Sequence, residues 1–313
     1  LVVGGVSSVA DLTADRIAEF LYITREIQDF IKNVYIPDLM AIAPFYKDWG
    51  AIGGTSNFLA WGEFPNSSLE PESLYFPRGI IRKRDLAGVE MAYESKVTEE
   101  VTRAWYEDGP GKHPYDGETN PLKEDPKYKP DSGGKYTWLK APRYDGSACE
   151  VGPLARVLVA YSKGHKEVKS LVNNTVKALG IPVSALFSTL GRTAARALET
   201  LVIGNAMETW VSELLDNIKN NNTKTYQPYN MPDSGMGAGL NDVPRGGLGH
   251  WIRIEKGKIA NYQYVVPSTW NLGPRDDSGK IGPVEEALIG TPVANPKQPL
   301  EILRTVHSFD PCI

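Results

Sequence analysis

Two places in the sequence carry residues suited to chemistry: a glycine-rich loop at Arg245 and the segment that ends the chain. Arg245 lies in Pro-Arg-Gly-Gly, and Ser268 follows a proline further on. Glycines let a backbone approach a ligand closely, and prolines fix its course. Cys312 follows Asp310 and Pro311, and thiolates are ligands for soft metals. The loop is therefore a candidate anion or ligand site, and Cys312 is a candidate metal ligand.

Each of these features also has a simpler interpretation. Arg245 could bind a carboxylate while the glycines only form a turn, and spacing alone favours that interpretation. Nothing in the sequence matches a phosphate-binding Walker loop. Most free cysteines are small buried hydrophobes, and Cys149, just before a predicted helix start, fits that role better than a functional one.

The four histidines give a weaker signal. His307 could serve as a ligand or a base, although "LEILRTVHS" resembles a last helical turn that the side chain completes. His250 alternates with apolar neighbours on a predicted strand, which favours a structural role. His113 and His165 stand in polar surroundings, and we expect both to be exposed.

A β-hairpin is predicted to position the loop. Residues 250–255 alternate in side-chain type, and residues 259–266 are rich in aromatic and β-branched side chains. Lys256-Gly257 between them is typical of a two-residue turn in which glycine takes a positive φ.

The hairpin predicts which residues meet at its open end. With Lys256 and Gly257 at the centre of the turn, Arg245 lies opposite Ser268, and Gly247 lies opposite Val266. A register error of one residue would shift these pairs without separating the two segments. The guanidinium and the hydroxyl are thus expected to converge.

Three long helices are predicted around this hairpin. The first has Thr13 as its N-cap, carries apolar residues at steps of three and four, and ends at Pro37. The second runs from Pro153 to Gly180. The third starts near Pro182 and reaches about Asn220, which would make it roughly 55 to 60 Å long. Gly204 within it could allow close helix packing or mark a kink.

These elements predict an α+β, helix-rich fold, a bundle of long helices with small β-sheets or hairpins. We expect residues 1–313 to form a single piece of a larger subunit. Residues 109–136 are rich in Gly, Pro and charge and predict a surface excursion, flanked by Trp105 and Trp138, which should be buried.

Composition excludes several classes of protein. A net charge of −4 and a pI near 5.7 argue against a nucleic-acid-binding face. No stretch is apolar enough to span a membrane, and two cysteines cannot form a disulfide framework. The opening "LVVGGVSS" resembles a strand entered midway rather than a natural start or a signal peptide. We therefore expect the chain to be an internal fragment of a longer protein.

Several motifs in order along the chain resemble one family. They are "TSNFL", "EVGPLARVLVAY", "LFSTLGRTAAR", "PRGGLGHW", "YQYVVPSTWNLGPRD", "ALIGTP" and "ILRTVHSFDPC". Together they resemble the large, catalytic subunit of nickel–iron hydrogenases. The resemblance implies that family's fold, with small sheets at the active-site end.

The resemblance gives Cys312 a role. The family binds nickel through four cysteines in two pairs, and Cys312 matches the first cysteine of the second pair, a terminal nickel thiolate. The other three cysteines are absent from this chain, as expected of a fragment. The implied cofactors are a nickel–iron centre whose iron carries cyanide and carbon monoxide, with magnesium near the C-terminus.

The resemblance also implies a pocket for the diatomic ligands on iron. Ser268 would donate a hydrogen bond to one cyanide, and Arg245 would lie near the other. Asp310 would pair with Arg245 beside the thiolate of Cys312. The residues implied as walls of the pocket are Pro244, Leu248, Val266 and Pro267.

The implied reaction is the reversible heterolytic cleavage of H2, with the hydride going to the metals and the proton to a nearby base. A guanidinium must first lose its own proton, which costs roughly 7 kcal/mol at neutral pH. A metal thiolate is therefore the favoured proton acceptor, and Arg245 and Asp310 are assigned electrostatic and orienting roles.

The implied partner is a small subunit that carries the iron–sulfur clusters, with a membrane cytochrome beyond it and a location in the periplasm at the cell membrane. The main alternative is the nickel-free, quinone-binding subunit of a respiratory NADH dehydrogenase built on the same scaffold. Such proteins generally lack the nickel cysteines, so Cys312 argues against this alternative. A simple anion-binding module with Arg245 as its anchor is the third interpretation.

Overall fold

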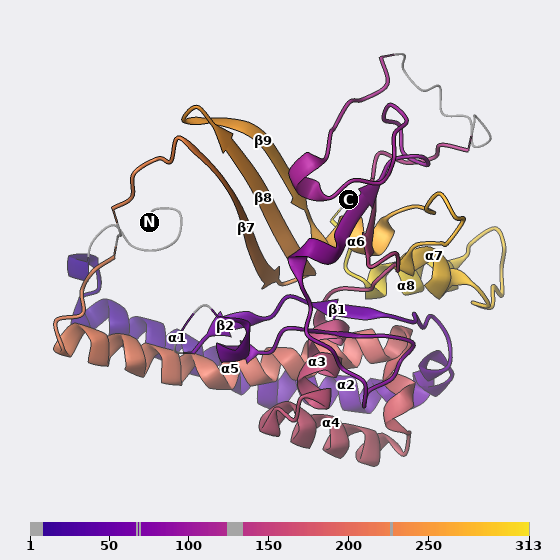
Figure 1. The fold of residues 1–313 in the computed structure, drawn as a ribbon. Helices are drawn as coiled ribbons and strands as arrows, with labels where there is room; N and C mark the ends of the chain where they lie inside the picture. The colour runs from indigo at the N-terminus through magenta and orange to yellow at the C-terminus, as the bar shows by residue number, and fades with distance from the viewer. Residues whose placement is uncertain (1–8, 67, 69, 124–133, 226–227, 313) are drawn as a thin grey trace. The chain divides into compact units, whose positions relative to one another are not determined.

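The computed structural model describes residues 9–66, 68, 70–123, 134–225 and 228–312. The chain forms two compact units, one of Leu1–Pro44 and Ala197–Met231, the other of Phe45–Arg196 and Pro232–Ile313. Both contain helices, and the second also contains the small sheets (Figure 1). The expected helix-rich α+β class is confirmed.

The first unit contains helix α1, Ala14–Phe30, which continues through a π-helical turn, Ile31–Tyr35, into α2, Ile36–Ile42. The hydroxyl oxygen of Thr13 accepts a hydrogen bond from the main-chain N–H of Arg16 at 3.4 Å, which confirms the predicted N-cap. The prediction that Pro37 ends the helix is wrong. Pro37 lies in the first turn of α2, where a missing N–H and a fixed φ are tolerated.

Helix α5, Thr189–Lys219, begins in the second unit and belongs mostly to the first. It is shorter than predicted, about 46 Å at 1.5 Å per residue, because Val183–Leu186 form a separate 3-10 turn before it. In the first unit, a Cβ added at Gly204 would lie 3.2 Å from Ile31. Gly204 therefore serves close packing between helices, and α5 has no kink there.

The predicted second helix is two helices, α3, Pro153–Ser162, and α4, Lys166–Leu179. Gly164, with φ of 80°, separates them, since a left-handed residue cannot continue a helix. Gly180, with φ of 64°, ends α4 as predicted.

The described residues of the second unit form four small antiparallel sheets. Three are pairs: β1, Phe58–Ala60, with β4, Gly79–Ile81; β2, Glu63–Pro65, with β3, Leu74–Phe76; and β5, Val97–Glu100, with β6, Ala141–Tyr144. The fourth has the order β7, Ser234–Val243, β8, Gly246–Glu255, and β9, Lys258–Val265. Three short helices follow: α6, Pro267–Leu272, α7, Pro283–Leu288, and α8, Leu300–Ser308.

Short 3-10 segments complete the described elements. They are Val9–Asp11, Ala43–Gly50, Pro71–Ser73, Glu94–Lys96 and Pro114–Asp116. Ala43–Gly50 consists of two such segments that meet at a kink at Tyr46. No helix in the described ranges combines the length and the apolar character that crossing a membrane requires.

The hydrophobic core of the second unit is built around three tryptophans from separate segments. Trp61, Trp251 and Trp270 are almost fully buried in one cluster, together with Leu59 of β1 and Val265 of β9. The core thereby packs β8 and β9 against Pro267–Leu272, the short helix that carries Ser268, one of the predicted site residues.

The hairpin turn at Lys256-Gly257 is confirmed, but its register changes within the strands. Glu255 pairs with Lys258 as predicted, and a bulge after Arg253 then shifts the pairing by one residue, so that Gly249 pairs with Val265. The predicted pairs at the open end are therefore wrong. There β8 pairs with β7 instead, a strand whose glycine-rich sequence lacks the alternation that predicts strands.

The described part of the excursion is fastened by Lys135. Its ammonium donates hydrogen bonds to the main-chain oxygens of Ala104 and Tyr106 at 3.0 and 3.1 Å, and it pairs with Asp108 at 2.7 Å. Trp105 and Trp138 pack edge to face, 5.1 Å apart. Trp138 remains 47% exposed, so its predicted burial is wrong. Residues 124–133 of the predicted excursion lie outside the described residues.

The histidines have mainly structural surroundings. His113 and His165 are half-buried and accept hydrogen bonds from main-chain N–H groups at the starts of Pro114–Asp116 and α4, so their predicted exposure is wrong. His250 hydrogen-bonds the hydroxyl of Tyr262 at 2.5 Å. His307 lies in the last turn of α8, as predicted, and is exposed.

Because His165 is partly buried, we expect the chain to lose stability in mild acid. Burial against Tyr75 and Phe76 lowers the pKa of His165 below its usual 6.5, although Glu167 opposes the shift. The unfolded chain therefore takes up the proton more readily, and this contribution to stability is present above about pH 6.5 and falls as the pH drops below it. His165→Asn keeps an acceptor at the cap but cannot titrate. Urea unfolding should show a smaller loss between pH 7.5 and 5.5 for the variant than for the parent chain.

Candidate functional site

Arg245 lies in the two-residue turn between β7 and β8. Gly246 follows it with φ of 128°, and a Cβ added there would stand 2.5 Å from the main-chain nitrogen of Gly152. Gly152, with φ of 126°, faces the main-chain oxygen of Arg245, 3.1 Å from where its own Cβ would be. Two glycines thus let the segment before α3 pass directly against the turn that carries the guanidinium.

Replacing Gly246 by alanine should therefore destabilise the chain by about 3 kcal/mol or more, from a strained φ combined with a backbone clash. Gly239→Ala on the neighbouring strand is the control, since a Cβ there meets nothing within 4 Å. Urea unfolding of both variants measures the difference. Equal stabilities would show that the turn relaxes freely.

A buried arginine, Arg156, also holds the turn that carries Arg245. Arg156 of α3 donates hydrogen bonds to the main-chain oxygens of Val243 and Pro244, each at 2.9 Å, and pairs with Asp242 at 3.4 Å. Asp242 also accepts a hydrogen bond from the N–H of Gly62 at 2.7 Å. The position of Arg245 is therefore set by buried charged groups rather than by a free surface loop.

The guanidinium of Arg245 contacts Asp310. Its Nε donates to the main-chain oxygen of Asp310 at 2.8 Å and lies 3.2 Å from the carboxylate. The two side chains are 40% and 49% exposed. An ion pair this accessible contributes at most about 1 kcal/mol to stability. Its main effect is therefore to fix the position of Asp310 relative to Arg245.

Ser268 holds the other end of the same segment. It is buried in the first turn of α6, and its Oγ accepts a hydrogen bond from the main-chain N–H of Cys312 at 2.9 Å. The thiol of Cys312 is exposed. Arg245 and Ser268 thus converge on residues 310–312, although through this segment and not through the strand pairing predicted for them.

Asp310 has φ of 53°, in the left-handed region that glycine usually occupies after a helix. Its N–H bonds the main-chain oxygen of His307 at 2.9 Å, closing the last turn of α8. Pro311 then fixes the next φ. A non-glycine residue in this conformation is tolerated where its surroundings hold it, and here Arg245 does so.

The residues expected to form walls lie beside these two anchors. Pro244 precedes Arg245 in the turn, and Val266 and Pro267 precede Ser268, with Pro267 buried. Leu248 lies half-buried on β8. Their role around diatomic ligands stays a prediction.

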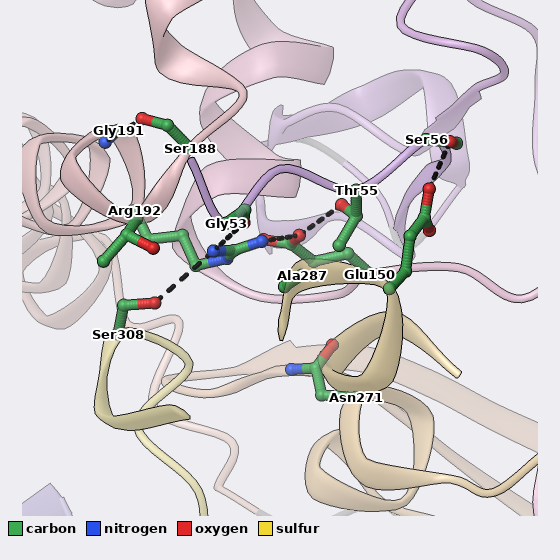
Figure 2. A network of polar contacts seen from close by, with 12 residues as sticks. Gly53, Thr55, Ser56, Glu150, Ser188, Gly191, Arg192, Asn271, Ala287 and Ser308 are labelled. Carbon is green, nitrogen blue, oxygen red and sulfur yellow. Dashed lines mark hydrogen bonds and ion pairs between the residues drawn. The ribbon is translucent and has the colours of Figure 1, made fainter. Parts of the chain in front are cut away.

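A buried network that the sequence did not predict reaches Ser308 at the end of α8 (Figure 2). Arg192 of α5 binds Glu150 through two hydrogen bonds, of 2.8 and 2.7 Å. Arg192 also donates to the main-chain oxygen of Gly53 at 2.6 Å, and the hydroxyl of Thr55 donates to Glu150 at 2.5 Å. The available signal was the charged residues in two mainly apolar stretches, Glu150 and Arg156 in "EVGPLARVLVAY" and Arg192 and Arg196 in "LFSTLGRTAAR".

The ligand chemistry fits one position of a larger metal site. Cys312 presents a thiol, but the described residues hold no group of three or more His, Cys, Asp or Glu side chains placed to bind a metal. Cys149 is fully buried, and burial raises the pKa of its thiol to about 12. Cys149 therefore stays protonated, in keeping with the structural role expected for it.

Comparison with known proteins points the same way. The family model for nickel-dependent hydrogenases matches residues 1–313. The uptake hydrogenase large subunit of Rhizobium leguminosarum bv. viciae is 45% identical over 335 residues, covering 99% of this chain and 56% of the relative. The hydrogenase-1 large chain of Escherichia coli K12 is 43% identical over 314 residues, covering 91% and 52%. The chain thus spans about half the length of the curated relatives it matches.

Solved structures agree on the fold. The Ni-Fe-Se hydrogenase from D. vulgaris Hildenborough in its reduced state superposes with a TM-score of 0.80 at 33% identity, covering 96% of this chain and 60% of that one. The [NiFeSe]-hydrogenase of Dm. baculatum gives a TM-score of 0.81 at 34% identity, covering 96% and 59%.

Proposed function

Because this chain belongs to the nickel-dependent hydrogenase family, we propose that the complete protein is the catalytic large subunit of a nickel–iron hydrogenase and cleaves H2 reversibly into protons and electrons. One observation carries the proposal. The segment Asp310 to Cys312 is held between Arg245 and Ser268, and its thiol is left exposed.

Cys312 would hold nickel as a terminal thiolate, with the remaining ligands supplied from outside this chain. We extend the proposal to cyanide and carbon monoxide on the iron, with Arg245 and Ser268 beside them, and to magnesium near the C-terminus. The chemistry of a soft, accessible thiolate supports the nickel assignment. When bound, the centre supplies the redox chemistry by which H2 loses two electrons.

The residues of this chain would accept the proton and orient the groups around it. Sγ of Cys312 is the favoured acceptor, because a thiolate is far easier to protonate than a guanidinium is to deprotonate. Arg245 would bring a positive charge near that position, and Asp310, its ion-pair partner, would orient the guanidinium. Ser268 would hold the main chain of Cys312 and so limit the positions that its sulfur can take.

The proposal includes a partner. Relatives are named large subunit or large chain, and one is named the quinone-reactive Ni/Fe-hydrogenase large chain of Wolinella succinogenes. We propose a heterodimer with an iron–sulfur small subunit that receives the electrons, a membrane cytochrome as the next acceptor, and a periplasmic location at the cell membrane.

The test begins by sequencing the gene on both sides of this stretch and producing the complete protein with its partner. Nickel and iron are then measured together with H2-dependent dye reduction. Both metals and H2 oxidation are expected. A complete protein with neither metal, but with bound quinone, would instead support the alternative role in an NADH dehydrogenase.

A further inference from the structure

The Glu150–Arg192 pair lies close to the end of α8 and is almost inaccessible to solvent. The two side chains are 2% and 3% exposed. Nη1 of Arg192 bonds the main-chain oxygen of Gly53 and lies 3.4 Å from the hydroxyl of Ser308. The guanidinium therefore has a single orientation, set by contacts from three separate segments.

Arg192 also lies against the residue that follows Ser308. Its Cζ is 3.7 Å from the centre of the Phe309 ring, and that ring is 4% exposed. Arg196, one helical turn further along α5, donates to the main-chain oxygen of Ser308 at 2.9 Å. Two arginines on one face of α5 thus hold two consecutive residues at the end of α8.

The chain has little freedom between this contact and the thiol. Asp310 takes a single left-handed conformation, and the ring of Pro311 fixes its own φ. Only these two residues separate Phe309 from Cys312. A displacement of Phe309 is therefore passed on to the sulfur and to the contacts with Arg245 and Ser268.

We propose that Arg192 is a positioning residue for the metal-binding segment. Held by Glu150, it fixes Ser308 and Phe309 and so sets where Cys312 presents its sulfur. The inference rests on the proposed function for its consequence at nickel, but the positioning itself is a property of this chain.

A contribution to stability explains the Glu150–Arg192 pair less well than a positioning role does. A buried ion pair is often no more stabilising than apolar residues of similar volume, because both charges lose their hydration. A planar fork above an aromatic ring, however, fixes direction as well as distance. Glu150 is itself oriented from its other side by the hydroxyl of Thr55.

Hydrogen exchange of the complete enzyme with its partner tests the positioning directly. Arg192→Lys keeps the charge but loses the two-pronged contact and the stacking. Exchange in the peptide that covers residues 306–312 should become about 10- to 100-fold faster, as expected when hydrogen bonds to a charged group are lost. The nickel electron paramagnetic resonance signal should shift in the same variant, because the thiolate direction changes.

Arg143→Lys is the matched control. Arg143 is also fully buried, pairs with Asp276 at 3.0 Å, and donates to the main-chain oxygens of Pro274 and Lys280. Its loss should accelerate exchange near residues 274–280 and leave both the 306–312 peptide and the nickel signal unchanged. If Arg192→Lys does not fold, Phe309→Leu removes the ring while leaving the ion pair, and the same local acceleration is expected.

Exchange in residues 306–312 within twofold of the parent enzyme in the foldable variants would overturn the proposal, as would an equal change in Arg143→Lys. Absence of nickel from the parent enzyme is a different result. It would refute the proposed function, while the exchange measurement would still decide whether Arg192 positions the segment.

Discussion

Cys312→Ser should remove nickel from the complete enzyme and lower H2-dependent activity by more than about 100-fold, the upper range for losing even an outer-shell partner of a metal. Serine is nearly isosteric, but its hydroxyl stays protonated at neutral pH and is a poor ligand for a soft metal. Because the thiol is exposed, unfolding free energy should change by no more than about 0.5 kcal/mol. Elemental analysis beside a thermal unfolding curve measures both effects.

Cys149→Ser separates metal loss from general damage. Cys149 is fully buried in the tryptophan core, so a hydroxyl there should destabilise the protein. The folded fraction should nevertheless retain its nickel. Full nickel content in Cys312→Ser would contradict the assignment of Cys312 as a ligand.

Arg245→Lys is expected to lower activity by about 10- to 100-fold, the equivalent of losing a hydrogen bond between charged groups, while nickel and iron stay bound. Lysine keeps the positive charge but cannot hold the main-chain oxygen and the carboxylate of Asp310 in one plane as the guanidinium does. Steady-state dye reduction and metal content, measured on the same preparation, give the result.

Arg253→Lys is its control, since Arg253 lies on β8, the strand that follows Arg245, but pairs with Asp116 and Glu255. Activity should be unchanged there. Asp310→Asn completes the set, because asparagine also tolerates a left-handed backbone. If Arg245→Lys left most activity while Asp310→Asn abolished proton exchange, the orienting role given to Arg245 would need to be revised.

Features governed by a few neighbouring residues were predictable from the sequence. The cap at Thr13, the helix end at Gly180 and the turn at Lys256-Gly257 each follow from local backbone rules. The course of the chain at Pro37 was not predictable, because a π-helical turn placed the proline at a helix start. Strand β7 gave no signal, since glycines replace the apolar residues that mark a strand.

In the candidate site, too, local features were predictable and contacts set by tertiary packing were not. The sequence predicts that Arg245 and Ser268 converge, and the resemblance adds Asp310, but the predicted pairing was wrong because β9 ends at Val265 and Ser268 lies in helix α6. The contact of Arg192 with Glu150 joins residues 42 positions apart. Such a pair depends on tertiary packing, and no periodic pattern along the chain announces it.

Arg245 holds the main chain of Asp310 through a hydrogen bond that does not depend on the charge of the Asp310 side chain. Every amino acid offers the main-chain oxygen that accepts this bond, so the side chain at position 310 affects this anchor only through the left-handed backbone that the residue must adopt. The carboxylate can then turn to another partner while the backbone beside the thiol stays tethered. A residue at position 310 that tolerates a left-handed backbone should therefore alter the charge beside the thiol more than it loosens the segment.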